Sequence, residues 1–186
     1  MTARSWTIYD SPLGQLTLIG GPGGISELRF PGDTGALDRD GCHPAALRDA
    51  LAQLDQYFAG SRRQFELPLD LGGTPFQLRV WAELAAIPYG QTRSYGQLAE
   101  AIGRPGCFRA VGAAVGRTPL PIIIPCHRAV GASGALTGYR GGLHRKRALL
   151  AHEHAVIPTR QGGADATPAR RTRRPPGSRS DPRAAA

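Results

Sequence analysis

The chain has 186 residues, of which 41% are hydrophobic and 20% are charged, and its formal net charge is +9. That length accommodates one domain of ordinary size or two small ones, and the longest apolar run falls far short of the roughly 18 to 20 residues of a membrane span. The first ten residues lack the apolar stretch of a signal peptide, and Cys42, Cys107 and Cys126 form no CxxC pair, so we expect a cytoplasmic protein without a disulfide scaffold, metal or other cofactor.

Residues 1–72 are predicted to form a small α/β domain. Residues 5–30 alternate apolar and polar side chains in three runs separated by Gly- and Pro-containing breaks, which predicts an antiparallel meander. Residues 44–59 begin with Pro44 and carry an apolar stripe at helical spacing, so a helix is expected there. Residues 65–71 are expected to return as a strand.

Residues 73–157 are predicted to form a mostly helical domain. The capping-box patterns TPFQ at residues 74–77 and SYGQ at residues 94–97 each predict a helix start, and a further helix begins near Gly106. Two short helices joined by about four residues have the outline of a helix-turn-helix, although ordinary helix pairs share that outline. The expected fold class is therefore α/β, a small antiparallel sheet with a helix followed by a mostly helical half.

The helix after Gly106 is rich in small residues, among them Ala110 and Gly112. Each glycine costs a helix about 0.8 to 1 kcal/mol relative to alanine, so another body is expected to approach this helix closely. That body is either a neighbouring element of the core or DNA, whose minor groove is only about 6 Å wide. In the second case Arg109 would enter the base stack as a wedge.

Residues 158–186 are predicted to be a disordered basic tail, because they contain few large apolar residues to offset their ordering entropy. From residue 157 to the end, seven Arg stand against two Asp, so +5 of the net charge of +9 lies there. An electrostatic arm for nucleic acid and a neutral extension are equally compatible with this composition.

Cys126 and His127 stand next to each other after Pro125 and the three isoleucines 122–124, which are expected to form a strand. A thiol reacts as the thiolate and needs a base, but adjacent side chains on a strand point to opposite faces. The pair therefore works only if the chain turns, and Pro125 favours such a turn. Glu153, the one acidic residue between Cys126 and the tail, can complete a Cys, His, Glu relay that holds the sulfur ionised. A buried, inert cysteine is the alternative.

One known family shares long stretches of this chain, namely FQLRVWAELAAIPYGQTRSYGQLAEAIG, RAVG and IPCHRAVGASGALTGYRGGLHRKRALLAHE. In these stretches the chain resembles the O6-alkylguanine-DNA alkyltransferases. The resemblance implies a ribonuclease H-like N-terminal domain and a repair reaction on duplex DNA, bound through its minor groove. O6-alkylguanine, and O4-alkylthymine as well, would turn out of the helix and pass its alkyl group irreversibly to Cys126, once per molecule. A monomer associated with the nucleoid is expected.

The resemblance also implies roles for individual residues. His127 would be the water-mediated base and Glu153 the carboxylate that orients it. Tyr95 would contact the everted base and the DNA backbone, and Arg109 would fill the space that the base leaves. The remaining expected positions are Ala110 and Gly112 on the minor-groove face of the helix, Tyr139, Arg140, Gly141 and Ala129 around the base pocket, and Arg128 and Pro125 as structural residues near the site.

Two positions depart from the family's pattern. Thr118 stands where the family usually has an Asn that connects the DNA-binding helix to the active-site turn, and the resemblance implies that it contributes to DNA binding. Ala129 stands in place of Val. Thr118 leaves room for a module that binds alkylated DNA without repairing it, and Cys126 argues against that alternative. A sequence-specific transcription factor is disfavoured, because the predicted recognition helix is mostly Gly and Ala. The basic residues 144–147 are expected either to touch phosphate or to form a solvated face.

Overall fold

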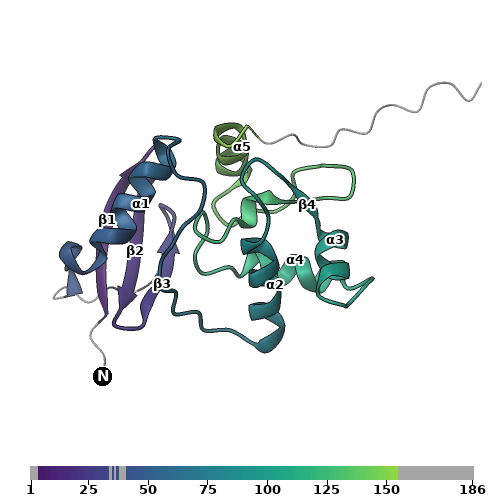
Figure 1. Cartoon of the computed structure of the whole chain (residues 1–186), viewed down its shortest axis with the longest axis horizontal. Coiled ribbons are helices and arrows are strands. Elements are labelled where there is room, and N and C mark those ends of the chain that lie inside the picture. Colours follow the sequence, from purple (N-terminus) through teal and green to yellow (C-terminus); the bar gives the residue numbers. More distant parts are fainter. Residues whose placement is uncertain (1–3, 34, 36, 38–40, 155–186) are drawn as a thin grey trace, which may run out of the picture.

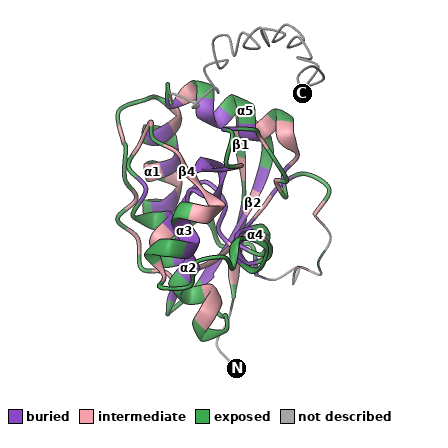
Figure 2. Cartoon of the chain, turned by 90° about the vertical axis from the view of Figure 1, so that its right-hand side faces the viewer, coloured by how far each residue is buried: buried purple, intermediate pink, exposed green. Residues whose placement is uncertain are grey.

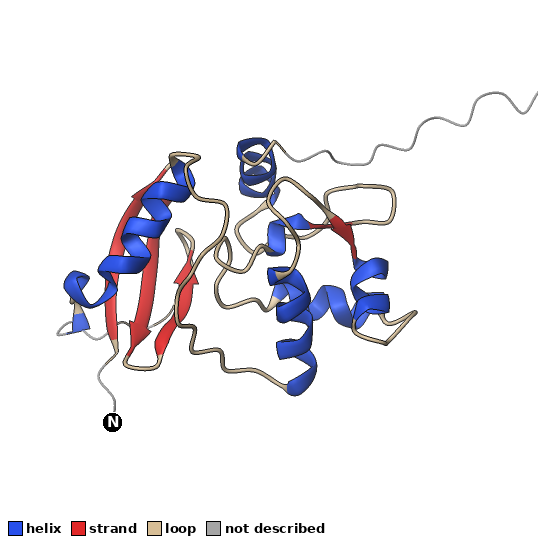
Figure 3. Cartoon of the chain, in the orientation of Figure 1, coloured by secondary structure: helices blue, strands red, loops and turns tan. Residues whose placement is uncertain are grey.

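The computed structural model describes the chain except for residues 1–3, 34, 36, 38–40 and 155–186, so the predicted tail lies outside the described residues. A three-stranded sheet with one helix across it forms the N-terminal half, and short helices form the rest (Figure 1, Figure 3). The expected fold class is confirmed.

The sheet consists of β1 (Ser5–Ser11), β2 (Gly14–Gly21) and β3 (Gly24–Arg29), which pair antiparallel in the order β1-β2-β3. Gly14 and Gly24 open the second and third strands with φ of 99° and 126°, a conformation that favours glycine and makes the two tight turns possible. Leu16 and Leu18, two alternate residues of β2, are fully buried in the core. The predicted meander is confirmed.

Helix α1 (Arg48–Phe58) lies across one face of this sheet and is preceded by a 3-10 turn, Pro44–Leu47 (Figure 1). The prediction of a helix in this stretch is confirmed. The strand expected at residues 65–71 is wrong, because only Leu69 forms a bridge, to Ile25 of β3. Pro68 has no N–H to donate, so a regular ladder cannot continue through it.

The second half contains α2 (Pro75–Ala85), α3 (Tyr95–Ala101), α4 (Phe108–Gly116) and α5 (Leu143–His152), with two short paired strands, β4 (Arg93–Ser94) and β5 (Ala129–Val130). Both predicted capping boxes form, so the starts of α2 and α3 are confirmed. A turn with left-handed glycines at residues 103 and 106 joins α3 to α4, which gives these two helices the arrangement of a helix-turn-helix.

The two halves share one hydrophobic core, which runs from the sheet and α1 into α2, α4 and α5 (Figure 2). A backbone hydrogen bond of 2.9 Å from Leu28 N to Pro119 O also joins β3 to the segment after α4. This packing holds the turn that carries Cys126 against both halves. None of the helices in the described part of the chain is long and apolar enough to cross a membrane.

Candidate active site

The backbone turns sharply just before Cys126. Residues 122–124 do not form the expected strand: Ile122 has a φ of 76°, and Pro121 pairs with Ile124 in a local bridge. A positive φ is costly for a β-branched residue, and the buried Ile122 side chain helps to hold it there. A single 3-10 turn, Cys126–Arg128, follows Pro125. The prediction that the chain turns at Pro125 is confirmed. Within the 3-10 turn, the side chains of Cys126 and His127 point about 120° apart around the turn axis.

Glu153 is the centre of a buried polar network. Its Oε1 lies 2.9 Å from Nε2 of His127, and it accepts hydrogen bonds of 2.8 Å from two nitrogens of Arg128, one at each oxygen. Burial opposes the charge of Glu153, but the hydrogen bonds and positive charge around it outweigh burial and hold its pKa well below the usual range. Glu153 is therefore a carboxylate that can only accept hydrogen bonds.

The tautomer of His127 follows from that carboxylate. Because Glu153 can only accept, Nε2 of His127 carries the proton and Nδ1 is left as an acceptor. Burial is the main reason why the pKa of His127 is lowered, so the ring is neutral at physiological pH. Nδ1 is buried and has no hydrogen-bond partner among the described residues. The ring is thus able to take up a proton at Nδ1.

The thiol of Cys126 is buried, with a relative exposure of 5%. Burial raises its pKa to about 11, although the charge of Lys146 and the nearby hydroxyls of Tyr139 and Thr118 work in the opposite direction. The expectation that the sulfur is held ionised is therefore wrong for the resting protein. The thiol keeps its proton because burial penalises the charged form more than these neighbours stabilise it.

Lys146 lies inside the site, although residues 144–147 were expected either to touch phosphate or to form a solvated face. Its Nζ is fully buried and donates to the backbone carbonyls of Ala129, at 2.6 Å, and Thr137, at 3.0 Å. Burial lowers its pKa to about 8, so it carries a positive charge near Cys126 at neutral pH. The carbonyl of Ala129, expected in the base pocket, is occupied by this lysine.

The loop between β5 and α5 is held by the N-terminal sheet. Tyr139 is expected in the base pocket, and its hydroxyl is buried against the Cys126 thiol with no hydrogen-bond partner of good geometry in the described chain. Arg140 instead pairs with Asp33, at 3.2 Å, and with Glu27 beyond it. A side chain at Gly141 would collide with the ring of Phe30, so packing on Phe30 accounts for this glycine.

The exposed face of α4 contains Arg109 and Ala110, and Gly112 lies half-buried beside the ring of Tyr95. Phe108 is 51% exposed, and the Arg109 guanidinium lies 5.9 Å from its ring centroid. Tyr95 begins α3, and its hydroxyl accepts a hydrogen bond of 3.3 Å from Thr137, which brings it to the same loop as Tyr139.

Thr118 was expected to contribute to DNA binding, but it lies inside the protein. It is 2% exposed, and its hydroxyl donates to the carbonyl of Val115 at the end of α4, at 2.8 Å, close to the Cys126 thiol. In this position it connects α4 to the cysteine from within.

Two groups that bond to Glu153 could not be predicted from the sequence. The hydroxyl of Tyr57, in α1, donates to Oε1 at 2.7 Å, and the backbone N–H of Gly90 donates to Oε2 at 3.3 Å. No local pattern links residue 57 to residue 153, because the fold alone brings them together. The described residues include no group of three or more His, Cys, Asp or Glu side chains that could hold a metal ion.

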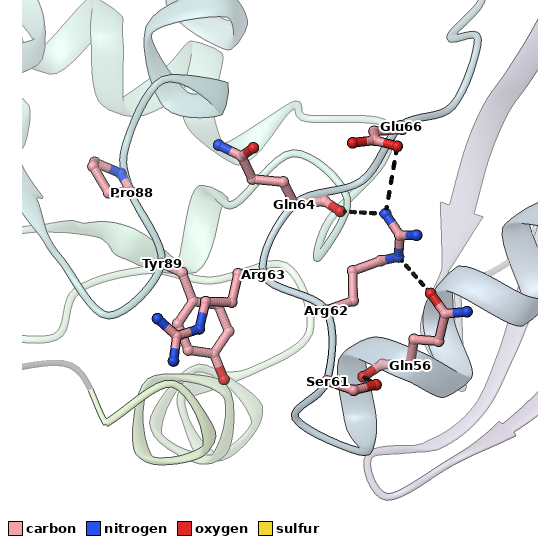
Figure 4. A pocket seen from close by; sticks show the side chains of 8 residues that line it. All are labelled: Gln56, Ser61, Arg62, Arg63, Gln64, Glu66, Pro88 and Tyr89. Carbon is pink, nitrogen blue, oxygen red and sulfur yellow. Dashed lines mark hydrogen bonds and ion pairs between the residues drawn. The ribbon is translucent and has the colours of Figure 1, made fainter.

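A separate pocket of about 640 Å³ opens between the end of α1 and the loop before β4 (Figure 4). In it Arg62 is held by Gln56 and by the backbone of residue 64, and Arg63 lies over the ring of Tyr89, 5.6 Å from its centroid. None of the predicted site residues lines this pocket, so we do not assign substrate binding to it.

A buried cysteine shares a turn with a histidine that is paired to a carboxylate, and this turn lies behind a helix-turn-helix with a small-residue face. These features define the class of a DNA-binding protein that uses a cysteine for group transfer. The comparisons with known proteins agree with that class. Residues 5–71 match the ribonuclease-like domain of 6-O-methylguanine DNA methyltransferase, and residues 75–155 match its DNA binding domain. The chain belongs to the 6-O-methylguanine DNA methyltransferase family, which confirms the resemblance found in the sequence.

Individual relatives are similar over most of the chain. The methylated-DNA--protein-cysteine methyltransferase of Mycobacterium tuberculosis is 52% identical over 151 residues, which cover 80% of this chain and 92% of the relative. The inducible methylated-DNA--protein-cysteine methyltransferase of Bacillus subtilis is 43% identical over 155 residues, which cover 79% of this chain and 84% of the relative. The crystal structure of Mycobacterium tuberculosis OGT in complex with DNA matches with a TM-score of 0.76 and 51% identity, covering 81% of this chain and 92% of that one.

Proposed function

We propose that this protein repairs alkylated DNA by turning O6-alkylguanine, and O4-alkylthymine as well, out of the duplex and transferring the alkyl group irreversibly to Sγ of Cys126. The observation that carries the proposal is the buried His127 and Glu153 pair, with Cys126 directly before His127 in the same 3-10 turn, in a chain of this family. The DNA complex of the Mycobacterium tuberculosis relative supports DNA as the partner. The retained cysteine and its relay argue against a module that only binds.

The first chemical step removes the thiol proton. Because the pKa of Cys126 is raised to about 11, the proton must leave as the alkyl group arrives. Nδ1 of His127 is the acceptor, through one bridging water, and Glu153 stabilises the imidazolium that forms. The buried charge of Lys146 favours the thiolate once it has formed.

The second step is displacement at the alkyl carbon. The sulfur forms a bond to that carbon while the bond between carbon and O6 breaks, and both electrons of that bond go to the leaving guanine. The hydroxyl of Tyr139 lies beside the sulfur and can donate to the leaving oxygen. Tyr95, the first residue of α3, is a second phenol that contacts the loop of Tyr139 through Thr137. The product thioether has no proton to lose and no route back, so each molecule acts once.

DNA would lie against α4. The small face around Ala110 and Gly112 fits a minor groove, and Arg109 is exposed at its start, where it can fill the space of the everted nucleotide. Base flipping costs a few kcal/mol, which this insertion offsets in part. We propose that the protein acts as a monomer at the nucleoid, with residues 1–72 and 73–157 as its two domains.

The test is intact mass spectrometry of the protein after mixing with duplex DNA that contains one O6-methylguanine. Wild type should gain the mass of one methyl group in exchange for a proton, in a single stoichiometric turnover. Cys126→Ala should gain none while it still binds the duplex. Methylation of the alanine variant, or repeated turnover by wild type, would show that the proposed function is wrong.

A further inference from the structure

Tyr57 reaches the relay from the other half of the molecule. It belongs to α1, its side chain is fully buried, and its hydroxyl donates to Oε1 of Glu153 at 2.7 Å. That oxygen is the same one that lies 2.9 Å from Nε2 of His127. The Tyr57 hydroxyl therefore bonds to the same oxygen atom that sets the tautomer of the His127 ring.

Oε1 of Glu153 receives three hydrogen bonds, from Tyr57, His127 and Arg128, whereas Oε2 receives two. A carboxylate offers about four lone-pair sites, so the group is saturated and its orientation is fixed. Among the side chains that bond to it, Tyr57 contributes a neutral donor whose hydroxyl can be removed without leaving a buried charge unpaired.

The Tyr57 ring is locked in place by its neighbours. Its centroid lies 5.4 Å from that of Phe65 and 5.1 Å from that of His152, and the ring of Tyr89 meets it edge-on at 6.2 Å. Nε2 of His152 also bonds to the backbone carbonyl of Tyr57, at 2.8 Å. A ring held on several sides presents its hydroxyl in one direction, toward Glu153.

We propose that Tyr57 is a positioning residue for alkyl transfer: its hydroxyl fixes the oxygen of Glu153 that orients His127, and it shares the negative charge of that oxygen. This inference rests on the proposed function. It makes the N-terminal half part of the chemistry, since α1 supplies a group that acts through the carboxylate.

Removal of the hydroxyl has a definite direction of effect. With one donor fewer, the charge on Oε1 interacts more strongly with Nε2–H of His127, so the imidazole holds a proton more tightly. The charged and titratable groups around His127 are Glu153 and Lys146 from the C-terminal segment and Arg128 and Cys126 from its own turn. All of them remain in Tyr57→Phe. The acid limb, which is the fall in transfer rate at low pH as His127 becomes protonated, should therefore move to higher pH.

The experiment measures the single-turnover rate of methyl transfer from duplex O6-methylguanine at saturating DNA, across the histidine range of about pH 5 to 8. For full-length Tyr57→Phe we expect a rate at neutral pH about tenfold below wild type, the order that one hydrogen bond to a charged group contributes. We also expect an acid limb at higher pH than that of wild type.

Two matched variants separate this role from packing. Tyr9→Phe removes a hydroxyl that bonds to Asp55 on the outer side of α1, at 2.8 Å, and should leave rate and profile unchanged. Tyr89→Phe loosens the same aromatic cluster, but its hydroxyl donates to the carbonyl of His152. It should lower thermal stability without moving the acid limb.

The outcomes are distinct. If wild type transfers no methyl group, the proposed function fails. If wild type transfers and Tyr57→Phe shows the wild-type profile, or a slower rate with an unmoved limb, the role of Tyr57 is overturned. Should Tyr57→Phe not fold, 3-fluorotyrosine at position 57 replaces it, because a stronger donor must move the limb to lower pH. An unmoved limb there would equally refute the inference.

Discussion

Burial, more than any single partner, sets the protonation of Cys126. Its pKa is raised from the ordinary 9.0 to about 11, against the opposing effect of Lys146 and two hydroxyls. A thiol that keeps its proton is a weak nucleophile and resists metal binding and oxidation. In the proposed mechanism, the reactive thiolate forms only when His127, the next residue in the same turn, takes up the thiol proton.

This raised pKa predicts how stability depends on pH. A group whose pKa rises on folding contributes stability that is complete below its unfolded value and is lost as the pH passes its folded value. Relative to Cys126→Ala, wild type should therefore lose about 2 kcal/mol of unfolding free energy between about pH 8 and pH 10.5. Urea unfolding of both proteins at the two pH values tests this. Lys146 titrates in both, so a constant difference would contradict the raised pKa of Cys126.

A second prediction concerns the charge of Glu153. Glu153→Gln removes the partner of Arg128, whose side chain is 6% exposed, and leaves a buried guanidinium without a counter-charge. We expect a loss of about 3 to 5 kcal/mol of unfolding free energy in urea at neutral pH. The control is Glu66→Gln, which removes a carboxylate that is 81% exposed and should change stability by less than about 0.5 kcal/mol. Equal effects of the two would contradict a buried ion pair.

The sequence could identify Cys126, His127 and Glu153 because all three belong to recognisable motifs. It could not identify the burial of Lys146. Four basic residues follow one another at the start of α5, and the phase of the helix against the loop after β5 decides which of them turns inward. The contact of Tyr57 with Glu153 was equally hidden, since 96 positions separate the two residues.

At the scale of elements, local signals were reliable where the stabilising contact is itself local. Both capping boxes form as expected, because each is made by groups three residues apart. The apolar stretches 65–71 and 122–124 were wrongly expected to be strands, since pairing requires a partner that the sequence does not specify. Helix α4 forms despite its glycines because Val111, Ala114 and Val115 pack inward.

The outer face of α4 supports a third prediction. Ala113 is exposed, so Ala113→Glu should not disturb the core, but it sets a negative charge where the phosphate backbone would approach. We expect binding to duplex DNA to weaken by at least about tenfold, from the cost of placing like charges together. Transfer from the free O6-alkylguanine base should be unchanged, because that base needs no groove.

The matched control for this variant is Ala52→Glu, which adds the same charge at an exposed position of α1. It should bind duplex DNA as wild type does, by fluorescence anisotropy at fixed ionic strength. Equal weakening by both variants would mean that net charge, and not the face of α4, governs binding.

At the scale of the whole molecule, the N-terminal half braces the C-terminal half at separate points. Arg145 in α5 donates to the carbonyls of Leu13, at 2.9 Å, and Gly141, at 2.8 Å, and lies over the ring of Phe30. The ring of Phe30 also meets that of Tyr139 at 5.7 Å. These contacts fix the loop that carries Tyr139, and none is visible in the sequence, because each joins segments far apart in the chain.

Such extensive contact between the halves predicts a single cooperative unfolding transition. The shared core, the Tyr57 and Glu153 hydrogen bond and the Leu28 and Pro119 hydrogen bond would all break if one half opened alone.

The two tryptophans provide a reporter in each half, Trp6 in β1 and Trp81 in α2, where Trp81 is 3% exposed and donates to the carbonyl of Ala114. In Trp81→Phe the fluorescence follows the sheet, and in Trp6→Phe it follows the helical half. Within each variant, the urea midpoint by fluorescence should coincide with the midpoint by far-UV circular dichroism. If the sheet reporter unfolded at a lower urea concentration than the circular dichroism signal, the two halves would unfold independently. In that case the shared core would not hold α1 rigidly enough for Tyr57 to govern the geometry of Glu153.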